Sequence, residues 1–138
     1  MDRRIQILIV DDSTTVRQGL LALIDTAPDM TVVGQATDAS TAIELTRRTQ
    51  PDVIIFDPSA PLEQNINTIA ALRQASGLTR ILILTDDGDE QPVRAALQAG
   101  VQGYLLKDAV LTDVLTAIRR AFEGQIVLHP SLSPGYII

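Results

Sequence analysis

Short aliphatic runs alternate with segments of helical periodicity along most of the chain. Runs rich in Ile, Val and Leu, bounded by polar or turn residues, are typical of buried parallel strands. Such runs cover about residues 5–10, 31–34, 53–56, 81–84 and 103–106. Between them, apolar residues recur at the spacing of one helix face, which predicts helices over about 13–27, 38–50, 65–76, 89–99 and 109–123.

The alternation of five strands with five helices predicts an α/β fold, a doubly wound parallel sheet of the flavodoxin-like type. Right-handed crossovers, with the topological switch between the first and third strands, give the five strands the order 2-1-3-4-5. We expect one domain over residues 1–129. Pro, Ser and Gly gather in residues 130–138, which we interpret as a C-terminal tail or the start of a linker.

Composition narrows the class of protein. Of the 138 residues, 46% are hydrophobic and only 3% are aromatic, so the core must be built from aliphatic side chains. The absence of cysteine excludes disulfides and thiolate metal sites and fits a reducing compartment. A net charge of −6 argues against direct contact with nucleic acid. The first apolar run, of only about six residues, is too short for a signal peptide or a membrane span. We therefore expect a cytoplasmic protein without a membrane partner.

Polar residues stand where four of the predicted strands end. Asp11 and Asp12 follow the first strand, Asp57 follows the third, Thr85 ends the fourth and Lys107 follows the fifth. In an open parallel sheet, the carboxyl ends of the strands meet at one edge, where ligands bind. Three carboxylates, a hydroxyl and an ammonium at one edge could hold a divalent cation, accept a phosphoryl group and neutralise its charge.

Each of these residues also has an ordinary explanation when it is taken alone. One of the first two aspartates could simply cap the following helix, Thr85 could be a β-branched strand residue, and Lys107 could be solvated. Three carboxylates this close repel one another unless a cation joins them, however. Mg²⁺ suits such a set of oxygen ligands. We expect the carboxylates of Asp12 and Asp57 and the backbone carbonyl of Ser59 as ligands, with Asp11 acting through a water.

The chemistry that these residues suit is phosphoryl transfer. Asp57 would act as the nucleophile and form an acyl phosphate, while Mg²⁺ offsets the developing charge. Thr85 would donate its hydroxyl to a phosphoryl oxygen. Lys107 would pair first with a carboxylate and then with the phosphoryl group.

Residues 5–129 resemble a response-regulator receiver domain. The resemblance is carried by Asp11–Asp12, the stretch from Asp57 to Pro61, Thr85, and the run Gly103-Tyr104-Leu105-Leu106-Lys107. It implies that a sensor histidine kinase phosphorylates Asp57, and that Thr85 and Tyr104 form the switch: the threonine moves toward the phosphoryl group and the ring turns inward. Partner affinity would then change on the face formed by the fourth helix, fifth strand and fifth helix.

The resemblance also implies partners and an output. Residues 32–36 and 103–108 look most like the subgroup whose output is a LuxR-type helix-turn-helix, which these residues do not contain. Activation would favour a homodimer, through the first and fifth helices or through the fourth and fifth helices with the fifth strand. The domain would perform only its own phosphorylation and slow hydrolysis and would not be a conventional enzyme.

Two other functions compete with this one. The first is a phosphorylation-independent dimerisation or docking module of the same family. The second is a phosphatase of the haloacid-dehalogenase type, which needs a second acid two residues after its aspartate; position 59 is Ser, so this reading is disfavoured. A nucleotide-binding site is weaker still, since no Gly-rich loop follows the first strand.

Several residues depart from the family pattern around the acceptor. Pro58 has no N–H to donate beside the phosphoryl group. Ala60 and Asn65 stand where the family has methionine and glycine, and Asn tolerates a positive φ better than most residues. Asp86 stands where a small residue is usual, so it weakens the phosphoryl form if it faces the site and is harmless if it faces solvent.

One further departure lies nearer the C-terminus. Asp108 replaces the frequent proline after Lys107, which leaves open whether the bond between them is cis or trans. His129 has no ligand-like neighbours in the sequence, and we interpret it as structural or solvated.

Overall fold

The predicted parallel sheet is present in a computed structural model that describes residues 3–109 and 111–132. Its strands are β1 (Ile5–Val10), β2 (Met30–Ala36), β3 (Val53–Phe56), β4 (Arg80–Thr85), β5 (Gly103–Leu106) and β6 (Val127–Leu128). All pairs are parallel, and the order is β2-β1-β3-β4-β5-β6. The α/β flavodoxin-like fold and the predicted order are confirmed. The sixth strand was not predicted, because a strand of two residues is too short to show a repeating pattern of hydrophobic positions.

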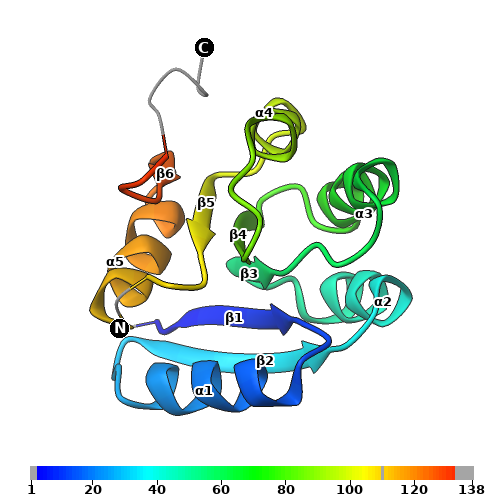
Figure 1. Cartoon of the computed structure of the whole chain (residues 1–138). Helices are drawn as coiled ribbons and strands as arrows, with labels where there is room; N and C mark the ends of the chain where they lie inside the picture. The colour runs from blue at the N-terminus through cyan, green and yellow to red at the C-terminus, as the bar shows by residue number, and fades with distance from the viewer. Residues whose placement is uncertain (1–2, 110, 133–138) are drawn as a thin grey trace.

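Helices cover both faces of the sheet. They are α1 (Thr14–Asp25), α2 (Ala39–Thr49), α3 (Leu62–Ala75), α4 (Glu90–Gln98) and α5 (Leu111–Phe122). Helices α1 and α5 lie on one face, and α2, α3 and α4 lie on the other (Figure 1). Among the described residues, none of the helices is both long and apolar enough to cross a bilayer.

Two hydrophobic cores form, one on each face, and the central strand β1 contributes to both. Ile5, Ile7 and Ile9 pack toward α1 and α5, whereas Leu8 and Val10 pack toward the other three helices. This alternation follows from the two-residue period of a strand. Because β1 is buried on both sides, its carboxyl end is held firmly, and Asp11 follows directly.

Side chains at the helix starts explain where α1 and α2 begin. Ser13 caps α1 and accepts the Val16 amide at 3.2 Å. Asp38 caps α2 and accepts the Thr41 amide at 2.8 Å. Both residue types are common helix caps, because a short side chain can accept an amide of the first turn.

Two local predictions are wrong. Helix α3 starts at Leu62 rather than near 65, so Asn65 lies inside the helix and no turn there needs a positive φ. Its amide group instead ties down Ala60, accepting the Ala60 N–H at 3.2 Å and donating to the Ala60 carbonyl at 2.7 Å. Phe122 was expected on the buried stripe of α5 with Val114 and Ile118, but it is 40% exposed. Ala121 faces the core in its place.

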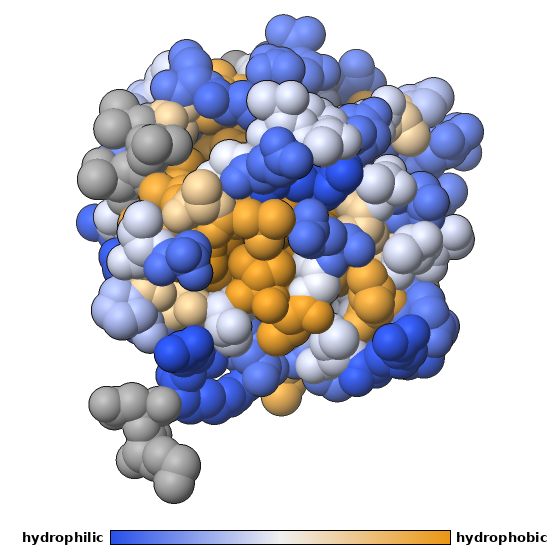
Figure 2. Space-filling model, turned by 90° about the horizontal axis from the view of Figure 1, so that it is seen from below, coloured by the Kyte–Doolittle hydropathy of each residue, from blue (hydrophilic) through white to orange (hydrophobic). Residues whose placement is uncertain are grey.

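One face of the molecule is more hydrophobic than its surroundings. Seen from below in Figure 2, hydrophobic side chains gather in the middle of the face over which α1 runs. A groove of about 260 Å³ lies between α1 and α5. Its lining is mostly apolar: Val16, Gly19, Leu20, Leu23, Leu84, Lys107, Ala109 and Val114.

Candidate functional site

The ends of β1, β3 and β5 bring three of the predicted site residues into contact. The Lys107 Nζ lies 2.7 Å from Asp57 Oδ2 and 3.2 Å from Asp11 Oδ2. These residues are far apart in the sequence and meet only because parallel strands end at one edge. The ammonium therefore bridges two carboxylates.

Asp11, Asp12 and Asp57 form an acidic cluster that could hold a metal. Each offers one carboxylate oxygen, and these oxygens all lie within 4.8 Å of one another. Asp11 is buried, Asp57 is partly buried and Asp12 is exposed. Ser59, the fourth predicted ligand residue, lines a cavity of about 60 Å³ together with Asp12 and Asp57. An all-oxygen donor set of this kind suits a hard divalent cation such as Mg²⁺.

Neither aspartate caps α1, since Ser13 does so, but Asp11 binds the cap residue. Its Oδ1 accepts the Ser13 amide at 2.8 Å, while its other oxygen faces Lys107. The Arg17 guanidinium donates to the Asp11 backbone carbonyl at 2.7 Å. Sequence reasoning missed Arg17. It lies in the first turn of α1, and its hydrogen bond restrains the loop that contains Asp11 and Asp12.

Lys107 keeps its charge in this environment. Burial favours the neutral amine, but the hydrogen bond to Asp57 and the charges of Asp57 and Asp11 outweigh it, so the pKa of Lys107 lies above its usual value. Its side chain is only 18% exposed. A partly buried ammonium that is charged at neutral pH, beside Asp57, is suited to receive a negatively charged group.

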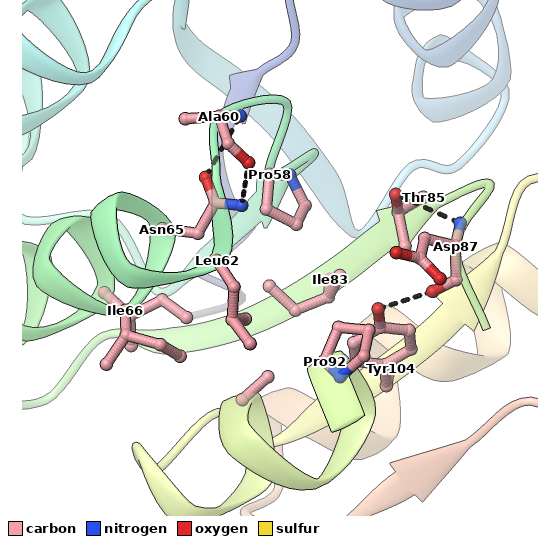
Figure 3. A pocket seen from close by; sticks show the side chains of 12 residues that line it. Pro58, Ala60, Leu62, Asn65, Ile66, Ile83, Thr85, Asp87, Pro92 and Tyr104 are labelled. Carbon is pink, nitrogen blue, oxygen red and sulfur yellow. Dashed lines mark hydrogen bonds between the residues drawn. The ribbon is translucent and has the colours of Figure 1, made fainter. Parts of the chain in front are cut away.

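The two predicted switch residues are linked by a residue that the sequence did not single out. Tyr104 is 1% exposed and its hydroxyl donates to the Asp87 carbonyl at 2.6 Å (Figure 3). The Asp87 amide in turn lies 3.5 Å from the Thr85 Oγ1, a long contact. Asp87 was missed because it acts through backbone atoms, which any residue type supplies. The ring of Tyr104 already occupies the inward position.

A cavity of about 90 Å³ lies beside this pair, between α3 and α4. Figure 3 shows Ile66, Ile83 and Tyr104 among its walls and Pro58 and Ala60 at its side. Ala60 is much smaller than a methionine, so the cavity has space that a longer side chain at this position could occupy.

The structure also answers the questions that Asp86, Asp108 and His129 raised. Asp86 is exposed, which matches the harmless alternative. Every peptide bond in the described residues is trans, including the one between Lys107 and Asp108. His129 is buried, and its Nε2 lies 3.0 Å from an Asp108 carboxylate oxygen, so it is structural rather than solvated.

Comparison with known proteins finds relatives of this chain in both sequence and fold. Residues 7–119 match the family described as the response regulator receiver domain. The chain is 39% identical over 128 residues to the nitrate/nitrite response regulator protein NarL of Escherichia coli, covering 93% of this chain and 59% of that protein. It is 36% identical over 126 residues to the uncharacterized transcriptional regulatory protein YxjL of Bacillus subtilis, covering 91% and 58%. The chain thus spans about three fifths of the length of these curated relatives.

Solved structures agree with this match. A LuxR-family two-component response regulator from an Aurantimonas species superposes with a TM-score of 0.87 at 32% identity, covering 97% of this chain and 95% of that one. The signal receiver domain of the putative response regulator NarL from Mycobacterium tuberculosis gives 0.82 at 29% identity, covering 89% and 99%. The chain belongs to the response regulator receiver domain family, and its relatives are response regulators of the NarL/LuxR type.

Proposed function

We propose that Asp57 is the phosphoacceptor of this receiver domain and that a sensor histidine kinase supplies the phosphoryl group. The observation that carries the proposal is the bridging position of Lys107, whose ammonium touches Asp57 and Asp11 beside the exposed Asp12. A carboxylate oxygen of Asp57 forms the new P–O bond as the P–N bond of the donor phosphohistidine breaks. The electron pair of that bond returns to the imidazole.

The residues around Asp57 would bind the metal, orient the carboxylate and contact the phosphoryl group. Asp12, Asp57 and the Ser59 carbonyl would hold Mg²⁺, with Asp11 acting through a water. When it is bound, the ion offsets the negative charge on the phosphoryl oxygens. Lys107 orients the Asp57 carboxylate before transfer and pairs with a phosphoryl oxygen afterwards. Thr85 turns its hydroxyl toward that group, and through Asp87 this movement reaches Tyr104.

The groove between α1 and α5 is a suitable docking surface for the kinase. It ends at Lys107, whose Nζ touches the acceptor, so a phosphohistidine-bearing helix seated in the groove would lie next to Asp57. Its mostly apolar lining suits the apolar stripe of such a helix.

The output of the pathway is proposed from the relatives. Several are named as transcriptional regulatory proteins and are longer than this chain. We infer a cytoplasmic regulator with a DNA-binding output domain that homodimerises on activation, and no enzymatic role beyond its own phosphorylation and hydrolysis. Residues 1–129 would form the receiver domain and 130–138 the start of the linker. The phosphorylation-independent docking module is not favoured, because Asp11, Asp57 and Lys107 meet as phosphoryl transfer requires.

Binding of beryllofluoride, a stable mimic of an aspartyl phosphate, tests the acceptor. We expect binding that requires both Mg²⁺ and Asp57 and that shifts the amide NMR signals of Thr85 and Tyr104. Asp57→Asn should abolish it. Asp25→Asn, the same change at an exposed position on α1, should leave it intact. A folded wild-type protein that does not bind would instead support the docking module.

A further inference from the structure

We propose that residues 129–132 form a docked segment that packs against the β4–α4 loop and β5, and that this docking is coupled to the phosphoryl state of Asp57. The coupling, though not the docking itself, rests on the proposed acceptor function. We call this stretch (His129, Pro130, Ser131 and Leu132) the exit segment, because it follows β6 at the edge of the sheet (Figure 1).

Backbone hydrogen bonds fix the path of the exit segment. The His129 amide donates to the carbonyl of Tyr104 at 2.9 Å, which extends the pairing of β6 with β5. The Leu132 amide then donates to the His129 carbonyl at 2.9 Å and closes a turn. The segment is therefore attached to the strand that carries one of the two switch residues.

The imidazole of His129 attaches the segment to the Lys107 loop. Its Nε2 lies 3.0 Å from Asp108, the residue after Lys107, and its Nδ1 lies 2.8 Å from the Ser131 hydroxyl. The ring is buried although Asp108 is exposed. A movement of Lys107 toward a new phosphoryl group would therefore be transmitted to His129 through one peptide bond and one polar contact.

The side chain of Leu132 attaches the segment to the Thr85 loop. Leu132 is only 8% exposed and shares a hydrophobic cluster with Tyr104. A Cβ built on Gly88 would lie 3.5 Å from a Leu132 methyl and 3.1 Å from a Leu106 methyl. Gly88 is thus enclosed by these two leucines, in the loop that joins Thr85 and Asp87 to α4.

These contacts predict whether docking of the exit segment favours or opposes the phosphoryl state. In the structure, the Thr85 hydroxyl lies 3.5 Å from the Asp87 amide, in the loop that follows β4. Binding a phosphoryl oxygen requires this hydroxyl to turn toward Asp57, which shifts the loop and Gly88 with it. Leu132 packs against the loop as it stands, so the docked exit segment opposes the shift. Reciprocally, phosphorylation loosens the exit segment.

The proposal gives the segment a role in output. In a protein whose output domain follows residue 138, the exit segment is the connection between the two parts. Its release would free the chain that leads to the output domain and uncover Leu106 and Gly88 on the face formed by α4 and β5.

Substitution of Leu132 tests the coupling. Leu132→Ala removes the methyl groups that face Gly88, so beryllofluoride should bind in Mg²⁺ more tightly than to the wild type, by about fivefold, the lower end of ordinary allosteric coupling. Leu132→Met keeps the position filled and should bind as the wild type does. Equal affinity of Leu132→Ala and the wild type would overturn the coupling while leaving the acceptor function intact.

A covalent lock tests the opposite direction. The chain has no cysteine, so the double variant Gly88→Cys with Leu132→Cys can be joined by a short bis-maleimide. The joined protein should bind beryllofluoride about fivefold more weakly than the same variant capped with a monofunctional maleimide. Failure of the two thiols to be joined in the folded protein would overturn the docking. Absence of binding to the wild type would overturn the acceptor function, and the coupling with it.

Discussion

The hydroxyl of Tyr104 donates to the backbone carbonyl of Asp87 at 2.6 Å, and this bond ties β5 to the loop that follows Thr85. The ring is buried and the loop is largely exposed. The inward position of Tyr104 is thus held by a contact within the domain, and the loop cannot move independently of the ring.

Tyr104→Phe keeps the ring and removes this bond. We expect a loss of about 0.5–1.5 kcal/mol in the free energy of unfolding, the ordinary net value of one hydrogen bond. The loss is modest because Asp87 is exposed and water can reach its carbonyl. Urea unfolding measures it. A loss of several kcal/mol would mean that the bond also supports the packing of the ring.

Tyr104 should resist ionisation in the folded protein. Burial raises its pKa, and the charges of Asp87 and Asp57 raise it further. Unfolded tyrosine ionises near pH 10, so the folded state holds the proton more tightly. The corresponding stability is complete below about pH 10 and is lost as the pH rises above it. In a Tyr136→Phe background, the phenolate absorbance should rise only together with unfolding. A separate rise near pH 10, with circular dichroism unchanged, would contradict this.

The raised pKa of Lys107 gives a second alkaline prediction. Lys107 is the one lysine in the sequence, so its side-chain NMR signal is unambiguous. In the folded protein it should titrate above the reference value of about 10.4. Its ion pair therefore stabilises the fold at neutral pH, and this contribution is lost as the pH rises through the raised pKa. Asp57→Asn should lower the titration midpoint, because it removes the strongest favourable partner.

Lys107 and a divalent cation should compete for the same carboxylates. Removal of the ammonium leaves Asp11 and Asp57 without their nearest cation, so Lys107→Met should bind Mg²⁺ more tightly, by roughly tenfold given the distances involved. A Mg²⁺ titration followed by thermal shift measures this. Arg80→Met, which removes a positive charge at the other end of β4, should not change the affinity for Mg²⁺.

The cavity beside Ala60 should accept a longer side chain. Ala60→Met can place its flexible thioether against Ile66 and Ile83, which we expect to stabilise the fold by about 0.5–1 kcal/mol, as cavity filling commonly does. Ala22→Met, at an exposed position of α1, is the matched control and should change little. A lower unfolding midpoint for Ala60→Met would show that the walls cannot accommodate the added atoms.

Asp86 should have little influence on the phosphoryl state, because its side chain is exposed to solvent. Asp86→Ala should change the affinity for beryllofluoride by no more than about twofold, since exposed charges are strongly screened. A several-fold gain would show that the aspartate repels the bound anion.

The meeting of Asp11, Asp57 and Lys107 could be predicted from the sequence because each of these residues follows a run of aliphatic residues. The position of a residue after a buried strand is nearly sufficient to place it at the edge of a parallel sheet, and Asp57 and Lys107 are the clearest cases. The contacts made through backbone atoms could not be found in this way. Asp87 acts through its amide and carbonyl, and nothing in its side chain signals that role.

The errors have different causes. The start of α3 was misplaced because Pro61 provides no side-chain cap, so the helix begins without a sequence signal. Phe122 was expected to be buried from its helical spacing with Val114 and Ile118, but Ala121 is the buried residue at this end of α5. Leu132 lies in the stretch that we interpreted as a tail, and its burial depends on how the chain folds back after β6, which no local period encodes.

The unequal burial of the strands has a consequence for local opening. β1 is covered on both faces and paired on both edges, whereas β6 consists of two partly buried residues paired only with β5. Amide protons of β1 should therefore exchange with solvent only through global unfolding, and those of β6 through small openings of much lower free energy. Asp11, which follows β1, is thus anchored in a part of the domain that rarely opens, whereas residues 129–132 follow a strand that opens more easily. Release of β6 and residues 129–132 therefore does not require β1, or the aspartates that follow it, to unfold.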